Sequence, residues 1–452
     1  MPAFFLQNFG CRATQADGAA IERQLSQKGL ERASSLGEAD VIVMNTCTVT
    51  EAADQDARAA IRRAHRENPQ AKVLVTGCYA QRAPREIASL AGVTWVVGNS
   101  HKHEVADIIE SGLPRNFVSL ENVALSAPAF TVIGDIFAHT ELITAPMFEG
   151  ADLASRTRPN VKVQDGCNNR CSFCIIPSVR GRSRSMPLER VLAEVQALVK
   201  AGYGEIVLSG INLGRWGRDF VPPRRFEELL RSLLEYTDVE KIRISSVEPM
   251  DWIDGVIELV SSSSRIAKHA HLPLQSGSDH ILRKMHRKYR PWHYAEKIRR
   301  IREAMPDAAI GADVMVGFPG ETDELFEESR SFIEHLSFTY LHVFTYSSRP
   351  GTRSAAMSGQ VPVAVARERN RVLREIGASK NREFRQSFRG RTLDAITLQA
   401  GDDLFTEALT DNYLKVRIVG RHQANQRMKV EVNEIAAEDM VVVAQPESVS
   451  VA

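Results

Sequence analysis

The sequence lacks three features that would place a protein in a broad class at once: a long apolar run, a charge excess and evenly spread cysteines. No stretch approaches the eighteen or so apolar residues of a membrane span, and residues 1–11 lack the basic start and apolar length of a signal peptide. Lys and Arg number 57 against 56 Asp and Glu, so net charge argues neither for nor against a nucleic-acid partner. We therefore expect a cytoplasmic protein without a membrane partner.

Cysteine is absent from the chain after residue 174. The six cysteines form two sets, the separated Cys11, Cys47 and Cys78 and the closely spaced Cys167, Cys171 and Cys174. Thiols stay reduced in the cytoplasm, where clustered cysteines bind metals or take part in chemistry more often than they form disulfides. The two parts of the chain are therefore expected to have different tasks.

The first hundred residues alternate short apolar runs with polar helical stretches. Strands are expected at 3–9, 41–47, 72–78 and 93–99, with helices at 15–30, 52–68 and 82–92 between them. This rhythm is typical of an α/β domain with an open parallel sheet. Cys47 and Cys78 each close a strand and Cys11 follows one by two residues, so we expect all three at the edge where such sheets bind ligands. The alternative is three buried cysteines that act as small apolar side chains.

A second α/β run begins near residue 160. Strands are expected at 160–165, 205–210, 241–247, 269–274, 309–317 and 340–347, with helices such as 187–202 and 292–305 between them. Six such units predict a partial (β/α)6 barrel with its site at the carboxyl ends of the strands. A basic stretch follows at 363–391. Alternating runs at 392–399, 404–411, 413–419 and 427–435 then predict a small antiparallel β domain.

The loop 166-GCNNRCSFC-174 has the cysteine spacing Cys-x3-Cys-x2-Cys. Structural zinc sites usually close with four protein ligands, so zinc would need a further ligand such as His269 or His271. Three thiolates on a cubane 4Fe–4S cluster instead leave one iron open for another ligand, which suits catalysis. The spacing, with Phe173 before the last cysteine, resembles the signature of the radical S-adenosylmethionine (SAM) enzymes.

Over essentially the whole chain the sequence resembles the methylthiotransferases of that superfamily. The resemblance is carried by 45-NTCTVT-50, 76-TGCYAQ-81, 165-DGCNNRCSFCIIPSVRGRSRS-185, 271-HLPLQSGSD-279 and 315-MVGFPGET-322. The segment 9-FGCRATQADG-18 departs from the family, which usually has a leucine- and asparagine-containing run at its first cysteine. The resemblance implies an N-terminal methylthiotransferase domain at 1–115, a linker at 116–158, a radical SAM core at 159–385 and an OB-like, RNA-binding TRAM domain at 386–452.

The resemblance also implies SAM and two 4Fe–4S clusters as cofactors. One cluster, which cleaves SAM to a radical, would be held by Cys167, Cys171 and Cys174. The second, which presents a methylthio group, would be held by Cys11, Cys47 and Cys78. Contacts to SAM are expected from residues that follow barrel strands or the cluster loop: Ser209, Gly210, Glu248, Gln275 and Arg180. The family acts on unactivated C–H bonds, so the cofactor carries the difficult step while the protein positions the parts.

The expected function is transfer of a methylthio group to carbon 2 of a hypermodified adenosine next to the tRNA anticodon. Thr48-Val49-Thr50 resembles the branch of the family that acts on N6-threonylcarbamoyladenosine more than the isopentenyladenosine branch. The partners would be a tRNA anticodon stem-loop, SAM and an electron donor such as flavodoxin or ferredoxin. The alternatives are an enzyme that modifies an aspartate of a ribosomal protein and a non-catalytic iron–sulfur protein that binds RNA.

Overall fold

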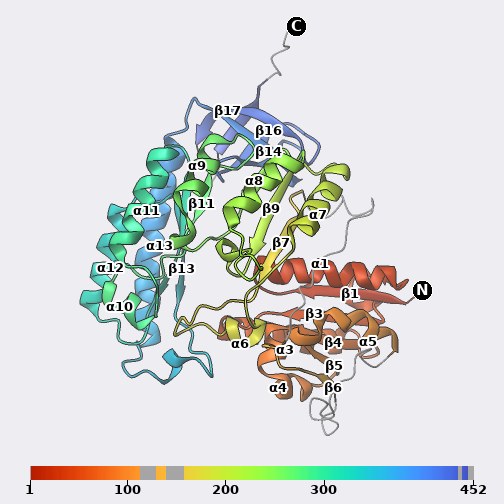
Figure 1. The fold of residues 1–452 in the computed structure, drawn as a ribbon. Helices are drawn as coiled ribbons and strands as arrows, with labels where there is room; N and C mark the ends of the chain where they lie inside the picture. Colours follow the sequence, from red (N-terminus) through yellow and green to blue (C-terminus); the bar gives the residue numbers. More distant parts are fainter. Residues whose placement is uncertain (1, 112–128, 139–156, 436–439, 446–452) are drawn as a thin grey trace.

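The computed structural model describes residues 2–111, 129–138, 157–435 and 440–445. Three parts follow one another along the chain: a parallel α/β sheet domain, an open barrel of α/β units and a small closed β barrel (Figure 1). The N-terminal domain and the small barrel lie on opposite sides of the central barrel. The expected fold class, α/β with a small C-terminal β domain, is confirmed.

The N-terminal domain is built on a sheet with the strand order β2-β1-β3-β4-β5-β6, in which every neighbouring pair is parallel. β3 is buried on both faces, as expected for a parallel sheet between two helical layers. Helices α1 and α5 pack on one face, and α2, α3 and α4 pack on the other. The elements are β1 (Ala3–Asn8), α1 (Arg12–Gln27), β2 (Glu31–Arg32), β3 (Val41–Thr46), α2 (Glu51–Glu67), β4 (Lys72–Gly77), α3 (Cys78–Arg82), α4 (Pro84–Ala88), β5 (Val93–Gly98), α5 (Val105–Ser111) and β6 (Phe130–Val132).

Part of the expected linker at 116–158 belongs to this sheet. β6 pairs in parallel with β5, where Trp95 lies opposite Phe130 and Val97 opposite Val132. Residues 112–128 and 139–156 of the expected linker lie outside the described residues. The N-terminal domain therefore continues at least to Val132, because its edge strand comes from the segment that was expected to be a linker.

The central barrel contains six parallel strands in two sheets, β10-β9-β7-β8 and β11-β12-β13. A bridge between Ile242 and Ile266 joins the two sheets, and β8 pairs antiparallel at the edge. This arrangement confirms the partial six-unit barrel. Its elements are β7 (Asn160–Asp165), α6 (Ile176–Arg180), β8 (Arg184–Ser185), α7 (Leu188–Lys200), β9 (Glu205–Gly210), α8 (Phe226–Tyr236), β10 (Lys241–Ile244), α9 (Asp254–Ser262), β11 (His269–His271), α10 (Asp279–Lys284), α11 (Pro291–Ala304), β12 (Ala309–Val316), α12 (Asp323–His335) and β13 (Tyr340–Thr345).

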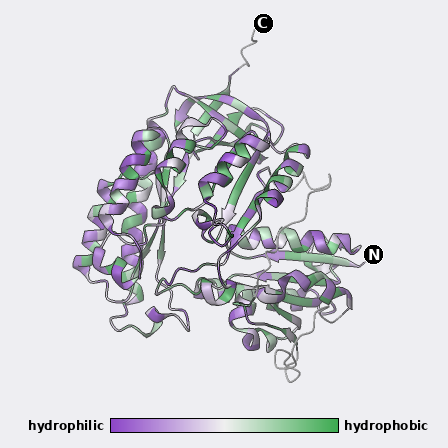
Figure 2. Ribbon diagram, in the orientation of Figure 1, coloured by the Kyte–Doolittle hydropathy of each residue, from purple (hydrophilic) through white to green (hydrophobic). Residues whose placement is uncertain are grey.

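A long helix, α13 (Val363–Gln386), leads from the central barrel to the small one. The small barrel closes in the order β14-β15-β16-β18-β17, and its only parallel pair among the described strands is β16 with β18. Its strands are β14 (Thr392–Gly401), β15 (Phe405–Thr410), β16 (Lys415–Val419), β17 (Arg427–Ile435) and β18 (Met440–Ala444). Figure 2 shows apolar strands beneath helices with hydrophilic outer faces. No helix in the described ranges is long and apolar enough to span a bilayer.

Candidate active site

Three cysteines meet at one edge of the N-terminal sheet, and we call Cys11, Cys47 and Cys78 the N-terminal trio. Cys11 precedes α1, Cys47 directly follows β3, and Cys78 is the first residue of α3 after β4. Because β1, β3 and β4 are neighbours in a parallel sheet, their carboxyl ends lie side by side. Gly10 has a φ of 93°, and a Cβ there would lie 2.6 Å from the Cβ of Cys47. The first two cysteines can therefore approach only because the residue before Cys11 has no side chain.

The other three cysteines, Cys167, Cys171 and Cys174, form the barrel trio in the loop between β7 and α6. The Cys167 sulfur accepts hydrogen bonds from the Asn169 backbone N–H at 3.4 Å and from the Asn212 side-chain amide at 3.6 Å. The Cys171 sulfur accepts one from Nη1 of Arg287 at 3.3 Å. N–H donors therefore already point at two sulfur atoms, as a negatively charged thiolate–metal centre requires.

The sulfur atoms of neither trio are packed as a single zinc ion would pack them. Zinc–thiolate bonds of about 2.3 Å in a tetrahedron place sulfur atoms roughly 3.8 Å apart. Among the described residues, three ligand atoms lie within 4.8 Å of one another only at His271, Asp313 and His342. A cubane cluster binds each cysteine through a different iron and separates the sulfurs more widely, so each trio fits a cluster better than one metal ion.

Burial makes the thiols poor acids until a metal binds. It raises the pKa of Cys47 to about 12, with a further contribution from Cys78, and raises that of Cys174 to about 12 with a contribution from Cys171. Cluster binding therefore has to release protons from these thiols.

A buried ion network joins the two domains between the trios. Asp17 of α1 accepts hydrogen bonds from Lys102 and Arg180, each at 3.0 Å, and a very short one from Lys162 of β7. Asp165, at the end of β7, accepts from Lys162 and Arg180. Burial raises the pKa of Asp17, but the neighbouring cations prevail and lower it to about 2. The carboxylates are therefore charged and hold the N-terminal sheet against the first barrel strand.

Arg180, which we expected to contact SAM, lies in this network instead. Its side chain is 2% exposed, and its guanidinium donates to the carboxylates of Asp165 and Asp17 and, at 3.4 Å, to the hydroxyl of Thr14. Burial lowers its pKa, but Asp165 and then Cys78 raise it well above the ordinary value. The positive charge of Arg180 therefore lies next to the N-terminal trio and not in an open SAM pocket.

A second buried cluster fixes the chain after Cys47. The Thr48 hydroxyl donates to Asp54 at 2.6 Å, and the same hydroxyl accepts from Arg82 and from Arg349 of the loop after β13. Thr50 caps α2 through a hydrogen bond from the Ala53 backbone N–H. The Thr48-Val49-Thr50 segment therefore has structural partners on both sides of the domain boundary.

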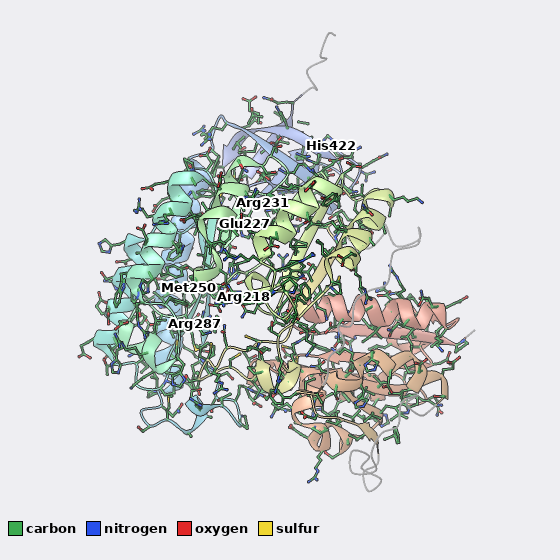
Figure 3. The ribbon with its side chains drawn as sticks, in the orientation of Figure 1. Arg218, Glu227, Arg231, Met250, Arg287 and His422 are labelled. Atoms are coloured by element: carbon green, nitrogen blue, oxygen red, sulfur yellow. The ribbon has the colours of Figure 1, made fainter. Side chains whose placement is uncertain are left out.

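The other expected SAM contacts lie at or just after the carboxyl ends of barrel strands. Ser209 and Gly210 end β9 and line the cavity described below. Glu248 accepts a short hydrogen bond from Arg287, the residue that also contacts Cys171. Figure 3 places Arg287 and Met250 next to each other on the barrel, and both line a narrow recess with Cys171.

Two buried oxygens in this region have no hydrogen-bond partner among the described residues. They are Oε1 of Gln275, a residue with a φ of 65°, and Oδ1 of Asn212, whose amide nitrogen contacts Cys167. Buried acceptors without donors cost free energy unless a ligand pairs with them. The ammonium group of SAM could pair with such acceptors, so these residues fit SAM beside the open iron of a cluster on the barrel trio.

One cavity of about 330 Å³ connects all three parts of the chain. From the N-terminal domain it is lined by Cys11, Arg12, Ala13 and Val49, and from the small barrel by Tyr413. Its barrel lining includes Ser209, Gly210, Arg243, His269, His271, Tyr340 and His342. The volume is in the range of small-ligand pockets. Cys11 of the N-terminal trio and two of the expected SAM residues, Ser209 and Gly210, therefore open onto the same space.

The small barrel closes one side of this cavity with a strained residue. Tyr413, in the turn between β15 and β16, has a φ of 68°, and its ring stacks on His269 with centroids 4.2 Å apart. Its hydroxyl accepts from Arg12 at 3.5 Å. A bulky residue in this backbone region costs free energy and is retained where the surroundings require it.

The sequence did not predict a role for Arg287, for Asn212 or for the aromatic and histidine side chains that line the cavity. Asn212 and His271 lie inside segments already selected, 208-LSGINLG-214 and 271-HLPLQSG-277, so a signal for them existed. No sequence pattern pointed to Arg287, Tyr340 or Tyr413, because only the folded chain brings them to the site.

The fold and the cysteine loop define a class before any relative is considered. An open six-unit barrel with Cys-x3-Cys-x2-Cys after its first strand is the architecture of a radical SAM protein. The family model described as Radical SAM superfamily matches residues 161–333, and the model described as uncharacterized protein family UPF0004 matches residues 3–98.

The relatives narrow the class to one family. A protein of Aquifex aeolicus named threonylcarbamoyladenosine tRNA methylthiotransferase MtaB is 37% identical over 94% of this chain and 98% of its own length. A protein of Saccharopolyspora erythraea named tRNA-2-methylthio-N(6)-dimethylallyladenosine synthase is 34% identical over 88% of this chain and 78% of its own. The chain belongs to the radical SAM methylthiotransferase family. Radical SAM proteins use SAM and a 4Fe–4S cluster, and the methylthiotransferases carry two clusters.

A solved structure agrees on the fold alone. The radical SAM methyltransferase TsrM of Kitasatospora setae superposes with a TM-score of 0.57 over 76% of this chain and 73% of its own, at 13% identity.

Proposed function

We propose that this protein transfers a methylthio group to carbon 2 of N6-threonylcarbamoyladenosine beside the tRNA anticodon. The proposal rests on the cavity that the two domains share. Cys11 of the N-terminal trio lines it, and so do Ser209 and Gly210 of the central barrel. A methylthio donor and a radical source must reach the same carbon atom, and this cavity joins the N-terminal trio, through Cys11, to the end of barrel strand β9. The relatives named for this reaction support the choice of substrate.

In the proposed reaction the barrel trio holds the cluster that binds SAM, and the N-terminal trio holds the second cluster. When bound, these groups supply hydrogen-atom abstraction and a methylthio donor, chemistry that no acid or base of the chain can perform on an adenine C–H bond. The described residues do the positioning. Arg287 donates to Cys171 and Glu248, and Asn212 donates to Cys167. Tyr413 covers one side of the cavity.

We propose the domain limits 1–132, 159–385 and 386–452, with RNA bound by the last of these and by α13. Three arginines of the expected basic stretch at 363–391 are neutralised: Arg371 pairs with Glu368 and Glu375, Arg369 with Glu321, and Arg391 with Asp307. Four exposed arginines of this stretch have no ion-pair partner among the described residues: Arg367, Arg374, Arg382 and Arg389. We assign the phosphate contacts to these four arginines. We also propose that the protein is cytoplasmic and that a flavodoxin or a ferredoxin is its electron donor.

The direct test uses anaerobically reconstituted protein, SAM, a chemical reductant and anticodon stem-loop RNA that carries N6-threonylcarbamoyladenosine. Mass spectrometry of the digested nucleosides should show the 2-methylthio product, and RNA with isopentenyladenosine should give far less. Product on the isopentenyl RNA alone would assign the chain to the other tRNA branch. Modification of a ribosomal-protein aspartate, without any tRNA product, would establish the protein-modifying alternative.

RNA binding is tested by replacing Arg367, Arg374, Arg382 and Arg389 with Gln. Each lost phosphate contact should reduce the slope of log affinity against log salt by roughly 0.7 to 0.9. The control is the same number of Arg-to-Gln changes at residues paired with helix carboxylates: Arg283, Arg299, Arg300 and Arg330. Substitution is preferable to truncation near residue 360, because removal of Tyr413 would also open the cavity. Equal salt slopes in both variants would move the phosphate contacts to another surface.

A further inference from the structure

One wall of the cavity carries two histidines, His271 and His342. His271 comes from β11 and His342 from β13, and Asp313 from β12, the strand between them, contacts both. Oδ1 of Asp313 lies 3.4 Å from Nε2 of His271 and 3.3 Å from Nδ1 of His342. The two imidazole rings are 5.4 Å apart and both line the cavity. We call these three residues the polar wall.

The three side chains of the polar wall do not use all of their hydrogen-bonding capacity within the described protein. His271 is 7% exposed; its Nε2 faces Asp313 at 3.4 Å, and its Nδ1 makes no hydrogen bond in the described structure. Burial raises the pKa of Asp313, but hydrogen bonding to His271 and His342 prevails and holds it well below its ordinary value. The carboxylate is therefore ionised. His342, whose side chain is 61% exposed, has its other nitrogen left to donate to a ligand.

Rings and a cation complete the surroundings of the polar wall. Tyr340 lies 5.9 Å from the ring of His271 and 5.1 Å from that of His342. Arg12, next to Cys11, has the hydroxyl of Tyr413 as its only hydrogen-bond partner among the described residues. Arg243 is not available, because Glu205 and two carbonyl groups of the small barrel take its N–H groups. The cavity thus combines faces on which a base can stack with N–H donors that suit an anion.

We propose that His271, Asp313 and His342 bind the polar substituent on N6 of the target adenine and so select the threonylcarbamoyl substrate. This inference rests on the proposed function. A threonylcarbamoyl group offers a carboxylate, a hydroxyl and urea oxygens, which can accept from the two imidazoles and Arg12. An isopentenyl group offers no acceptor and would bury the polar wall without partners, at about 1–3 kcal/mol for each group left unpaired.

A metal ion is the competing occupant of the same three side chains. Histidines that bind metals almost always donate their second ring N–H to a carboxylate, a carbonyl or water. Nδ1 of His271 has no such partner among the described residues. The observations therefore favour the substrate over a metal ion.

The test measures substrate discrimination in two ways. Fluorescence anisotropy gives the affinity of reconstituted protein for stem-loop RNAs with threonylcarbamoyladenosine, isopentenyladenosine or plain adenosine, and mass spectrometry gives kcat/KM for the same RNAs. In His342→Leu the affinity and kcat/KM for the threonylcarbamoyl RNA should fall roughly 10- to 100-fold, the range for a lost hydrogen bond to a charged group. The loss should appear mainly in KM, and the affinity for the adenosine RNA should change much less.

Two further variants keep the test decisive. His342→Gln retains an N–H donor and should recover part of the preference. His335→Leu, at an exposed position at the end of α12, should leave the preference unchanged. Iron content and melting temperature will show whether each variant is folded and loaded.

Three outcomes would overturn the inference. If the wild type prefers the threonylcarbamoyl RNA and His342→Leu and Asp313→Asn prefer it equally, the polar wall is not the selector, while the proposed function stands. If the wild type never modifies that RNA, the proposed function fails and the inference fails with it. If the wild type contains stoichiometric zinc that is lost in His342→Leu, the polar wall is a metal site.

Discussion

The barrel trio and the N-terminal trio contain the same number of cysteines but are assembled in different ways. The barrel trio lies in one short loop, and its cysteines need only that loop to face a common centre. The N-terminal trio takes one cysteine from each of three neighbouring strand ends, so its geometry depends on the whole sheet. The barrel trio is therefore formed by one short loop, whereas the N-terminal trio is formed by tertiary structure. Substitutions far from the cysteines should disturb the N-terminal trio more than the barrel trio.

The domain boundary shows the same contrast. Asp17 and Arg180 place the N-terminal trio against the barrel through buried ion pairs, whereas the hydrogen bonds to the barrel trio come from within the barrel, from Asn169, Asn212 and Arg287. Separation of the domains should therefore abolish methylthio transfer while sparing SAM cleavage. Four predictions test this comparison, from the largest expected effect to the smallest.

The largest effect is expected from the cysteines themselves. With two cubane clusters the reconstituted protein should contain about eight irons. Replacement of the barrel trio by Ala should halve that number and abolish SAM cleavage. Cys47→Ala should still release 5′-deoxyadenosine from SAM but form no methylthio product. Normal product from Cys47→Ala would show that the N-terminal cysteines are only core residues.

Gly10→Ala should affect the N-terminal trio selectively. The new methyl group would lie 2.6 Å from Cβ and 2.8 Å from Sγ of Cys47, at a φ of 93° that side chains avoid. We expect loss of about half of the iron, with SAM cleavage retained. The control is Gly29→Ala, which has a φ of 82° but no atom within 4 Å, so only a backbone cost of about 1–2 kcal/mol applies. Full iron content in Gly10→Ala would argue against Cys11 and Cys47 as ligands of one cluster.

Asp17→Ala should weaken the contact between the domains. It leaves Lys102, Lys162 and Arg180 buried with too few carboxylates, which typically costs about 3–5 kcal/mol. The free energy of unfolding from urea titration should drop by that amount, and the ratio of product to 5′-deoxyadenosine should fall. Glu110→Ala breaks an exposed pair with Lys28 and should change stability by less than about 1 kcal/mol. Equal losses in the two variants would contradict a special role of the buried network.

The smallest effect concerns Glu194 of α7, which lies near this boundary. Burial raises its pKa to about 7, against weaker opposing effects of Arg190, Arg23 and Lys162. Because the folded pKa lies above the unfolded value of about 4.3, the folded state binds the extra proton. The free energy of unfolding should therefore be highest below about pH 4.5. It should decline by on the order of 3 kcal/mol between about pH 4.5 and pH 7.

Glu194→Gln should remove this decline and raise the melting temperature at pH 8 above that of the wild type. The measurement is a series of melting curves from pH 5 to pH 8. A parallel pH dependence in wild type and variant would show that Glu194 is ionised in the folded protein.

Most strands were predictable because their apolar runs end at turn residues, but several ends were not. Strands expected at 241–247 and 269–274 end at Ile244 and His271. There the chain leaves the sheet to form the site, as the φ of 65° at Gln275 illustrates. β6 and β18 escaped prediction because each is short and pairs at a position that depends on strands distant in sequence.

Arg180 is the clearest case of a residue whose role could not be predicted. Its position after the cluster loop favoured a contact with SAM, and nothing nearby in sequence indicated that Asp17 would lie 3.0 Å from its guanidinium. The polar wall was hidden for the same reason, because His271, Asp313 and His342 come from three different strands.

The sequence by itself determined the chemistry that the two trios can support. The spacing of the barrel trio is a property of one loop, and the strand-end positions of the N-terminal trio follow from the rule that parallel strands share an edge. Tertiary structure alone decided which cavity Cys11 shares with the central barrel, which cation lies beside the N-terminal trio and which side chains line that cavity. Side-chain direction and inter-domain packing depend on contacts between residues far apart in the chain, and periodicity carries no information about those contacts.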